Sequence, residues 1–183
     1  MQLIRCTAKL RKEMGLKPKD LTSEVPEESR LGQWHANLIY IDRRKTLLFV
    51  NDRTLFNFIA PAVSRAQISE LDKIFRLMLS CTLADEKVPD STRELILEEY
   101  TEIAYAKSSS RIVLGAANDL AYHYETQILH AGGVHSPLAP QIIRKNNRLP
   151  FKPLKYLDPI NALAAVYGFE PLPHDRSFME KED

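Results

Sequence analysis

Four residues that could bind a ligand stand within or directly after the two apolar arms of residues 34–53, a segment that reads WHANLIYIDRRKTLLFVNDR. Its branched and aromatic residues predict a β-hairpin with two buried arms, at 34–41 and 46–51. A polar side chain buried in such an arm loses free energy unless it finds a partner. Imidazole, amide and guanidinium groups that converge on one strand face would suit an anionic or hydrogen-bonding ligand. The four residues are His35, Asn37, Asn51 and Arg53.

The turn of this hairpin decides whether the four side chains meet. It reads Asp-Arg-Arg-Lys and lacks the Asn-Gly pair of two-residue turns, which favours a loop of three or four residues. A loop of residues 43–45 would pair Asn37 with Asn51. It would also pair His35 with Arg53, so that one face carries all four, whereas a one-residue slip would separate them. The alternative is structural: the asparagines bond each other or a nearby loop, and the histidine belongs to the core.

A second polar group lies on the longest predicted helix. Arg111, Gly115 and Asn118 recur at helical spacing, and glycine inside a helix costs about 1 kcal/mol relative to alanine. This glycine suggests close approach by a backbone or a ligand. Asp119 precedes His123 by four residues, where it could raise the pKa of the imidazole and make it an acid or base. The alternative is a helix–helix contact at the glycine and an ordinary exposed Asp–His pair.

A third candidate is a basic run interleaved with aromatic rings between residues 144 and 156. Such residues can hold phosphates and stack on bases, although the same pattern is typical of a solvated helix face followed by a connector. The members are Arg144, Lys145, Arg148, Phe151, Lys152, Lys155 and Tyr156. Arg43 and Arg44 in the hairpin turn either extend this basic surface or protect the turn. Three serines at 108–110 resemble an anion-binding helix N-terminus, a weak signal by itself.

The composition sets the class of protein. A chain of 183 residues, 44% hydrophobic and 27% charged, can bury the core of one soluble domain. No apolar run is long enough to cross a bilayer and no signal peptide is apparent, so we expect a cytoplasmic protein without membrane contact. Cys6 and Cys81 are expected to be free thiols. The sequence has no metal-ligand spacing and no phosphate- or dinucleotide-binding loop, so we expect neither a metal nor a cofactor.

Charge is segregated along the chain although the net charge is only +1. Basic residues dominate positions 5–19 and 141–157, and acidic residues dominate 85–102. Such blocks form solvated faces or pair with one another, with a partner or with a second copy in a homodimer.

The pattern of elements favours an α+β fold. Strands are expected at 3–7, in the hairpin and at 102–107, and residues 55–59 fit either a strand or a helix start. Helices are expected at 8–14, 68–83, 90–100, 111–130, 137–147 and 159–167. This irregular alternation predicts a small, mostly antiparallel sheet built around a β-hairpin and packed against several helices. We expect a single α+β domain at residues 1–169 and a polar tail at 170–183.

Several short segments follow one another in a recognisable order. They are IRCT at 4–7, WHAN at 34–37, RRK at 43–45, FVN at 49–51, TLF at 54–56, RIVLG at 111–115, NDL at 118–120 and NRLP at 147–150. The ordered set, which covers residues 3–167, resembles a family of small bacterial proteins catalogued as a domain of unknown function. The resemblance implies a bacterial, soluble, cytosolic single domain, and it carries over no catalytic residue and no cofactor.

These observations lead to one hypothesis with two rivals. The polar faces of the hairpin and of the long helix are expected to pack together into one cleft for an anionic ligand, a nucleic acid or a nucleotide, whose phosphate the arginines would hold. The expected binding residues are His35, Asn37, Arg43, Arg44, Asn51, Arg53, Arg111, Asn118 and Asp119. One rival is a metal-independent hydrolase or nuclease with His35 or His123 as acid or base. The other is a protein–protein interaction module without chemistry.

Overall fold

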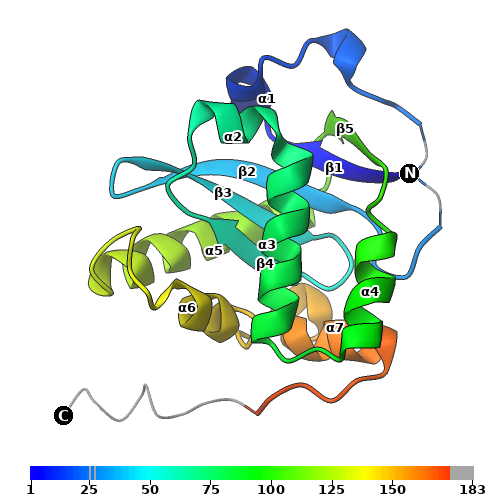
Figure 1. Ribbon diagram of the computed structural model, residues 1–183, viewed down its shortest axis with the longest axis vertical. Helices are drawn as coiled ribbons and strands as arrows, with labels where there is room; N and C mark the ends of the chain where they lie inside the picture. Colours follow the sequence, from blue (N-terminus) through cyan, green and yellow to red (C-terminus); the bar gives the residue numbers. More distant parts are fainter. Residues whose placement is uncertain (25, 27, 174–183) are drawn as a thin grey trace.

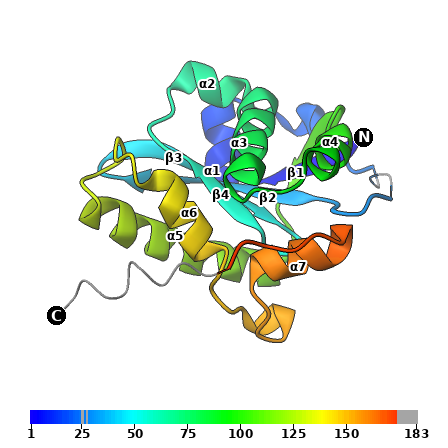
Figure 2. The same ribbon diagram turned by 60° about the horizontal axis from the view of Figure 1, so that its bottom comes forward.

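The computed structural model describes residues 1–24, 26 and 28–173. In this part of the chain a five-stranded sheet lies between two layers of helices (Figure 1, Figure 2), which confirms the α+β class. The sheet order is β4-β3-β2-β1-β5. The strands are β1 Gln2–Cys6, β2 Trp34–Ile41, β3 Arg44–Asn51, β4 Asn57–Ala60 and β5 Ile103–Lys107. The sheet is mixed, because β1 pairs in parallel with both β2 and β5, whereas β2–β3 and β3–β4 are antiparallel.

Helices cover both faces of the sheet. Figure 2 shows α1 to α4 on one face and α5 and α6 on the other. The helices are α1 Ala8–Met14, α2 Arg65–Ser69, α3 Leu71–Asp85, α4 Asp90–Glu98, α5 Arg111–His130, α6 Ala139–Asn146 and α7 Pro159–Tyr167, with 3-10 turns η1 Pro18–Asp20 and η2 Lys152–Leu154. The apolar stretch predicted as one helix from residue 68 is two helices, since the backbone of Glu70 leaves the helical conformation. No helix of the described residues is long and apolar enough to cross a membrane.

The two faces of β2 and β3 have different cores. Trp34 of β2 and Phe49 of β3 both contact Phe75 of α3, in an aromatic cluster that also includes Phe58 and Tyr100, with ring centroids 5.1–6.3 Å apart. Because side chains alternate along a strand, the residues directly before and after Trp34 in β2 and Phe49 in β3 point to α5 instead. The helix turns a buried stripe toward them, made of Val113, Ala116, Ala117, Leu120, Tyr124 and Ile128.

The hairpin register differs from the predicted one. Asp42 and Arg43 form a two-residue turn in which both residues are left-handed, with φ of 50° and 58°, and Ile41 pairs with Arg44. The expectation of a longer loop is therefore wrong. The backbone twist of such a turn matches the right-handed twist of the strands, and this match outweighs the cost of positive φ at residues other than glycine.

The change of register moves the polar residues of the hairpin apart. His35 pairs with Val50, and Trp34 pairs with Asn51. His35 and Asn37 therefore face α5, whereas Asn51 belongs to the opposite side of the sheet. The predicted polar tail starts at residue 170, and its residues 174–183 lie outside the described residues.

Candidate functional site

The buried Asn51 serves the loops around it, as the structural alternative predicts. Its Nδ2 donates to the carbonyl oxygens of Leu31 and Gln33, each at 3.1 Å. Its Oδ1 accepts from the backbone N–H groups of Arg53 and Thr54, and from the hydroxyl of Thr54 at 2.9 Å. Every polar atom of this amide is thus committed to holding the chain before β2 against the chain after β3. Asn51 has no free group for a ligand.

The polar face of α5 does not meet the hairpin. Arg111, Asn118 and Asp119 are exposed, because the helix turns its apolar stripe to the sheet. This orientation buries more apolar surface than the one in which the polar face meets the sheet. The hypothesis of one cleft shared by the hairpin and this helix face is therefore wrong. In the described part of the chain no hydrogen bond joins Asp119 to His123, and the imidazole of His123 is half-buried.

The remaining predicted arginines do not form one common surface. Arg43 and Arg44 are exposed at the hairpin turn. Arg53 is also exposed, and its Nη1 donates to the carbonyl oxygen of Arg30. Of the basic run, Arg148 is buried in an ion pair with Glu86, whereas Lys152 of η2 and Lys155 directly after it are exposed. The run is therefore not a continuous basic surface.

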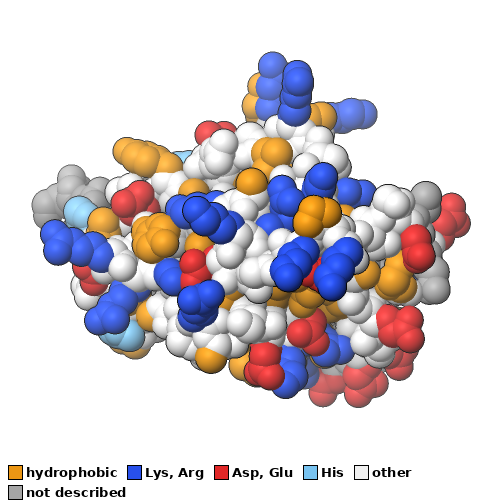
Figure 3. All heavy atoms as spheres, turned by 90° about the horizontal axis from the view of Figure 1, so that it is seen from above, with side chains coloured by type: hydrophobic (Ala, Val, Ile, Leu, Met, Phe, Trp, Pro, Cys, Tyr) orange, Lys and Arg blue, Asp and Glu red, His pale blue; other side chains and the backbone are white. Residues whose placement is uncertain are grey.

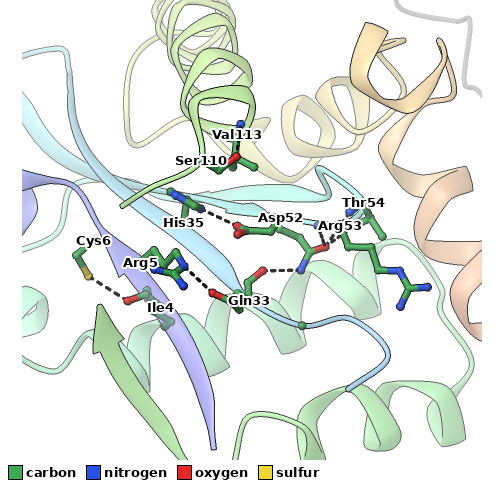
Figure 4. A network of polar contacts seen from close by, with 12 residues as sticks. Ile4, Arg5, Cys6, Gln33, His35, Asp52, Arg53, Thr54, Ser110 and Val113 are labelled. Atoms are coloured by element: carbon green, nitrogen blue, oxygen red, sulfur yellow. Dashed lines mark hydrogen bonds and ion pairs between the residues drawn. The ribbon is translucent and has the colours of Figure 1, made fainter. Parts of the chain in front are cut away.

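His35 is a buried histidine with one partner. Its side chain is 2% exposed, and its Nδ1 lies 2.6 Å from Oδ1 of Asp52 (Figure 4). Its Nε2 is buried and has no hydrogen-bond partner among the described residues. Sequence reasoning did not select Asp52. The signal for it is the true register: the N–H of Asp52 bonds to the carbonyl of Gln33, two residues before His35, so the residue after β3 lies beside the start of β2.

The topology creates a second place for a site, between β1 and β5. These two parallel strands are neighbours, but the helices that follow them cover opposite faces of the sheet. β1 leads into α1 on the α3 side, and β5 leads into α5 on the other side (Figure 2). In open sheets a crevice forms at such a switch point, outside the carboxyl ends of the strands, and ligands bind there.

A cleft of about 540 Å³ lies at this switch point. One wall is the face of β1 and β5 that α5 leaves uncovered, including Leu3, Arg5 and Ala106. The other wall is the segment 18–24, which the hydrogen bond from the N–H of Thr22 to the carbonyl of Tyr105 holds at the edge of the sheet, at 2.9 Å. We call this hollow the switch-point cleft.

Arg5 is the positive group fixed inside the switch-point cleft. Its Nε donates to Oε1 of Gln33 at 2.5 Å (Figure 4), and its Nη1 donates to the carbonyl of Lys107 at 3.1 Å. Its Nη2 has no hydrogen-bond partner in the described part of the chain. Two bonds therefore hold the guanidinium plane in place while one nitrogen stays open to a ligand.

Further polar groups surround Arg5. Lys107, Ser109 and Glu24 also line the cleft, and Lys107 contributes the carbonyl that accepts from Arg5. The N-terminus of α5, capped by Ser110, follows directly and adds a partial positive charge to this end of the cleft. The arrangement suits an anionic group, with hydroxyls and one carboxylate beside it to bond the rest of a ligand.

The cysteine next to Arg5 does not supply a nucleophile. Burial raises the pKa of the Cys6 thiol to about 12, and the nearby charge of Arg11 offsets only part of that rise. A thiol with this pKa is protonated near neutral pH and reacts slowly.

Sequence reasoning missed Arg5 and Lys107 as site residues. Two signals were present: a charged residue within the short apolar segment at 3–7, and the serines at 108–110 directly after a strand. Their joint meaning depends on β1 and β5 being neighbours, which no local pattern reveals.

Residues 3–162 match a family model described as Domain of unknown function (DUF6933). The match runs from β1 into α7, so it includes all five strands and the residues that line the switch-point cleft. It confirms the resemblance found in the sequence. No curated protein matches the chain.

Proposed function

The chain belongs to the family described as Domain of unknown function (DUF6933), and we propose that it binds a small phosphate-bearing molecule of the nucleotide class in the switch-point cleft. The observation that carries the proposal is the guanidinium of Arg5, held by two hydrogen bonds with its third nitrogen directed to no protein acceptor in the described residues. An arginine fixed in this way is prepared for a phosphate or a carboxylate, because no side-chain freedom is left to lose on binding.

The size and the walls of the cleft support a small molecule. Its volume of about 540 Å³ falls within the range of about 300–1,000 Å³ that is common for small-molecule sites. Pro18 and Leu21, which are not buried, offer apolar surface for a ring or a carbon skeleton. The α5 N-terminus adds partial positive charge next to Arg5. A phosphate would lie near Arg5 and this N-terminus, with the apolar part of the ligand against the segment 18–24.

Glu24 narrows the choice among phosphate compounds. A carboxylate beside the cleft repels a bare phosphate, but it accepts hydrogen bonds from the hydroxyls of a sugar. Thr22 and Ser23 on the same wall can bond sugar oxygens as well. A nucleotide or a sugar phosphate therefore fits these residues better than inorganic phosphate does.

The hydrolase rival has weaker support. His35 is almost fully buried, and it does not line the switch-point cleft. A general acid or base must reach the proton that it transfers directly or through one water molecule. His123 lies on α5, and it does not line this cleft either.

The proposal is tested by isothermal titration calorimetry of the purified protein. The titrants are nucleoside monophosphates and triphosphates, the matching unphosphorylated nucleosides, ribose 5-phosphate and inorganic phosphate. We expect saturable binding of phosphorylated compounds with sugar hydroxyls, weaker binding of inorganic phosphate and none of the nucleosides. Absence of heat from every phosphorylated compound at millimolar concentration would refute the proposal.

A further inference from the structure

The solvent side of α5 carries exposed residues in one straight line. The opposite side of the helix packs on β2, β3 and α6. Because an α-helix repeats about every 3.6 residues, positions three and four apart along the chain follow one another on the same side. The exposed residues on the line are Arg111, Gly115, Asn118, Tyr122, Glu125 and Leu129. We call them the α5 stripe.

The middle of the α5 stripe contains an exposed ring and a gap. Tyr122 is 68% exposed, so most of its ring lies in solvent. Gly115 stands two turns earlier on the same line, and beyond its own stretch of helix no described atom lies within 4 Å of the position that a Cβ would take. The close approach that this glycine suggests in the sequence is therefore not made by the rest of the described chain. A flat ring from another molecule can lie against the helix at this point.

The ends of the α5 stripe carry opposite charges. Arg111 begins the helix, and Glu125 lies three positions after Tyr122. Both charged residues are exposed, and neither forms an ion pair with a described residue. Along the helix the order is thus a cation, a gap, an amide, a ring and an anion. When this order is reversed, the ring meets the gap and the anion meets the cation, so the stripe is complementary to an antiparallel copy of itself.

A second copy of this chain is therefore the partner that the stripe fits. In a two-fold contact the same surface of both copies comes together, so residue i of each copy meets residue j of the other. An axis that crosses the helices just after Asn118 places Tyr122 of each copy against Gly115 of the other. The same axis brings Arg111 of each copy opposite Glu125 of the other to within one residue, about 1.5 Å along the helix. We infer that the chain forms a homodimer in which two α5 helices pack antiparallel through the α5 stripe.

Asn118 lies at the two-fold axis of this pair. Its carboxamide both donates and accepts, so the two copies of the side chain can bond each other. In coiled coils an asparagine in the contact line fixes the register of the helices at a cost in stability. We therefore expect Asn118 to select this register and to add little affinity.

The expected dimer is weak because its contact is one helix long. The 20 residues of α5 extend for about 30 Å, and Tyr122 and Leu129 supply the large exposed apolar side chains of the stripe. Stable interfaces commonly bury about 1,200–2,000 Å² in total, which is more than two single helices bury against each other. A dissociation constant on the order of 10–100 μM is therefore expected.

Other sides of the molecule are less suited to a second copy. Figure 3 shows lysine and arginine side chains spread over the side that carries α1 and α2. The helix α4, in contrast, carries the acids Asp90, Glu94 and Glu98. A two-fold contact sets a surface against itself, so a surface with one sign of charge repels its copy. The α5 stripe has one cation and one anion at its ends, and it avoids this repulsion.

Sedimentation velocity of the purified protein, from about 5 to 500 μM, tests the inference because association depends on concentration. We expect a monomer–dimer equilibrium for the wild type. Arg111→Glu and Glu125→Arg should each weaken association about tenfold or more, because every dimer of either variant contains two like-charge contacts. An equimolar mixture of the two variants should associate within about threefold of the wild type, since both contacts of the mixed dimer join opposite charges again.

The matched control is the pair Arg44→Glu and Glu98→Arg, which reverses one exposed cation and one exposed anion outside α5. Each control should associate within about twofold of the wild type, and their mixture should behave as its components do. Tyr122→Ala should weaken association about tenfold, because it removes the ring from the centre of the contact. Circular dichroism melting of each variant at the lowest concentration separates loss of the contact from loss of the fold.

Three results would overturn the inference: a wild type that stays monomeric at the highest concentration, a mixture of Arg111→Glu and Glu125→Arg that associates no more tightly than either variant alone, or an equal loss in the controls. The first result would leave the stripe to a different protein. The inference does not depend on the function proposed for the switch-point cleft, because the substituted residues do not line that cleft. Arg111→Glu should therefore bind nucleotide as the wild type does in calorimetry, so failure of the nucleotide proposal and failure of this inference are distinguishable.

Discussion

Nδ1 of His35 lies 2.6 Å from Oδ1 of Asp52, across the open end of the hairpin. The imidazole is 2% exposed and the carboxylate 26%, so the pair reaches from the core to the edge of solvent. With the proton on Nδ1, the histidine donates to the carboxylate, and this bond fixes both the ring orientation and its tautomer. The pair thereby ties the segment after β3 to β2, beneath α5.

His35→Ala should lower the free energy of unfolding by about 2–4 kcal/mol, because it leaves a cavity under α5 and removes the partner of Asp52. Asp52→Asn should lower it by about 1 kcal/mol or less, since the amide oxygen still accepts the Nδ1–H bond. Urea unfolding followed by circular dichroism measures both. A His35→Ala protein as stable as the wild type would contradict the core role.

Asn51→Ala should lower the free energy of unfolding by about 2–4 kcal/mol, because five hydrogen bonds lose their partner in a buried position. Asn118→Ala is the matched control: it makes the same change on the exposed side of α5, and it should alter stability by less than about 0.5 kcal/mol. Urea unfolding of the two variants in parallel gives the comparison. Equal effects would show that the loop bonds of Asn51 contribute nothing specific.

Arg148→Met should lower the free energy of unfolding by about 3–5 kcal/mol. Glu86 is 1% exposed, and its two oxygens accept from Nη1 and Nη2 of Arg148 at 2.9 and 2.7 Å, so the variant leaves a buried carboxylate without its main partner. The double variant Glu86→Leu/Arg148→Met should be more stable than Arg148→Met alone, because no unpaired charge remains. A double-mutant cycle in urea measures this, and strict additivity of the two changes would refute the coupling.

Cys6 should contribute a loss of stability at alkaline pH. Its pKa in the folded protein is raised from 9.0 to about 12 by burial, so the protonated thiol favours the folded state below pH 9. As the pH rises from 9 toward 12, the unfolded chain releases this proton and the folded one retains it, and that contribution is lost. The stability difference between the wild type and Cys6→Ala should therefore shrink above pH 9. A difference independent of pH would contradict the burial of the thiol.

Arg5→Gln should weaken the binding of a nucleotide about tenfold or more in calorimetry, because it removes the charge and the open nitrogen from the switch-point cleft. Arg53→Gln makes the same change at an exposed arginine outside the cleft, and it should leave the dissociation constant within twofold. Equal affinity in the wild type and Arg5→Gln would locate the ligand elsewhere. The melting temperature of each variant controls for the fold.

The sequence predicted the elements of this fold better than their arrangement. The apolar spacing of residues 111–130 and the branched arms around residues 34–51 are local patterns, and the helix and the hairpin that they predict are present. The register failed because Asp42 and Arg43 adopt a conformation that residue preferences disfavour, and the error of three positions moved Asn51 to the other face.

The candidate site was less accessible to sequence reasoning, for a related reason. Arg5 and Lys107 belong to strands that are neighbours in space and distant in the chain. Local periodicity carries no information about which strands pair, so two basic residues about a hundred positions apart gave no sign of a shared cleft. Conversely, Asn118 and Asp119 stood out in the sequence, and they lie on the solvent side of α5.

The place of β1 between β2 and β5 also constrains how the chain acquires its structure during synthesis. β1 leaves the ribosome before the other four strands of the sheet although it is an interior strand, and one of its edges stays open until residues 103–107 have been made. Closing so long a loop is slow relative to local contacts, and an open strand edge can pair with another chain in the meantime. The hairpin and α3 can assemble early, whereas the switch-point cleft is complete only when β5 docks, so a nascent chain would form this cleft late in folding.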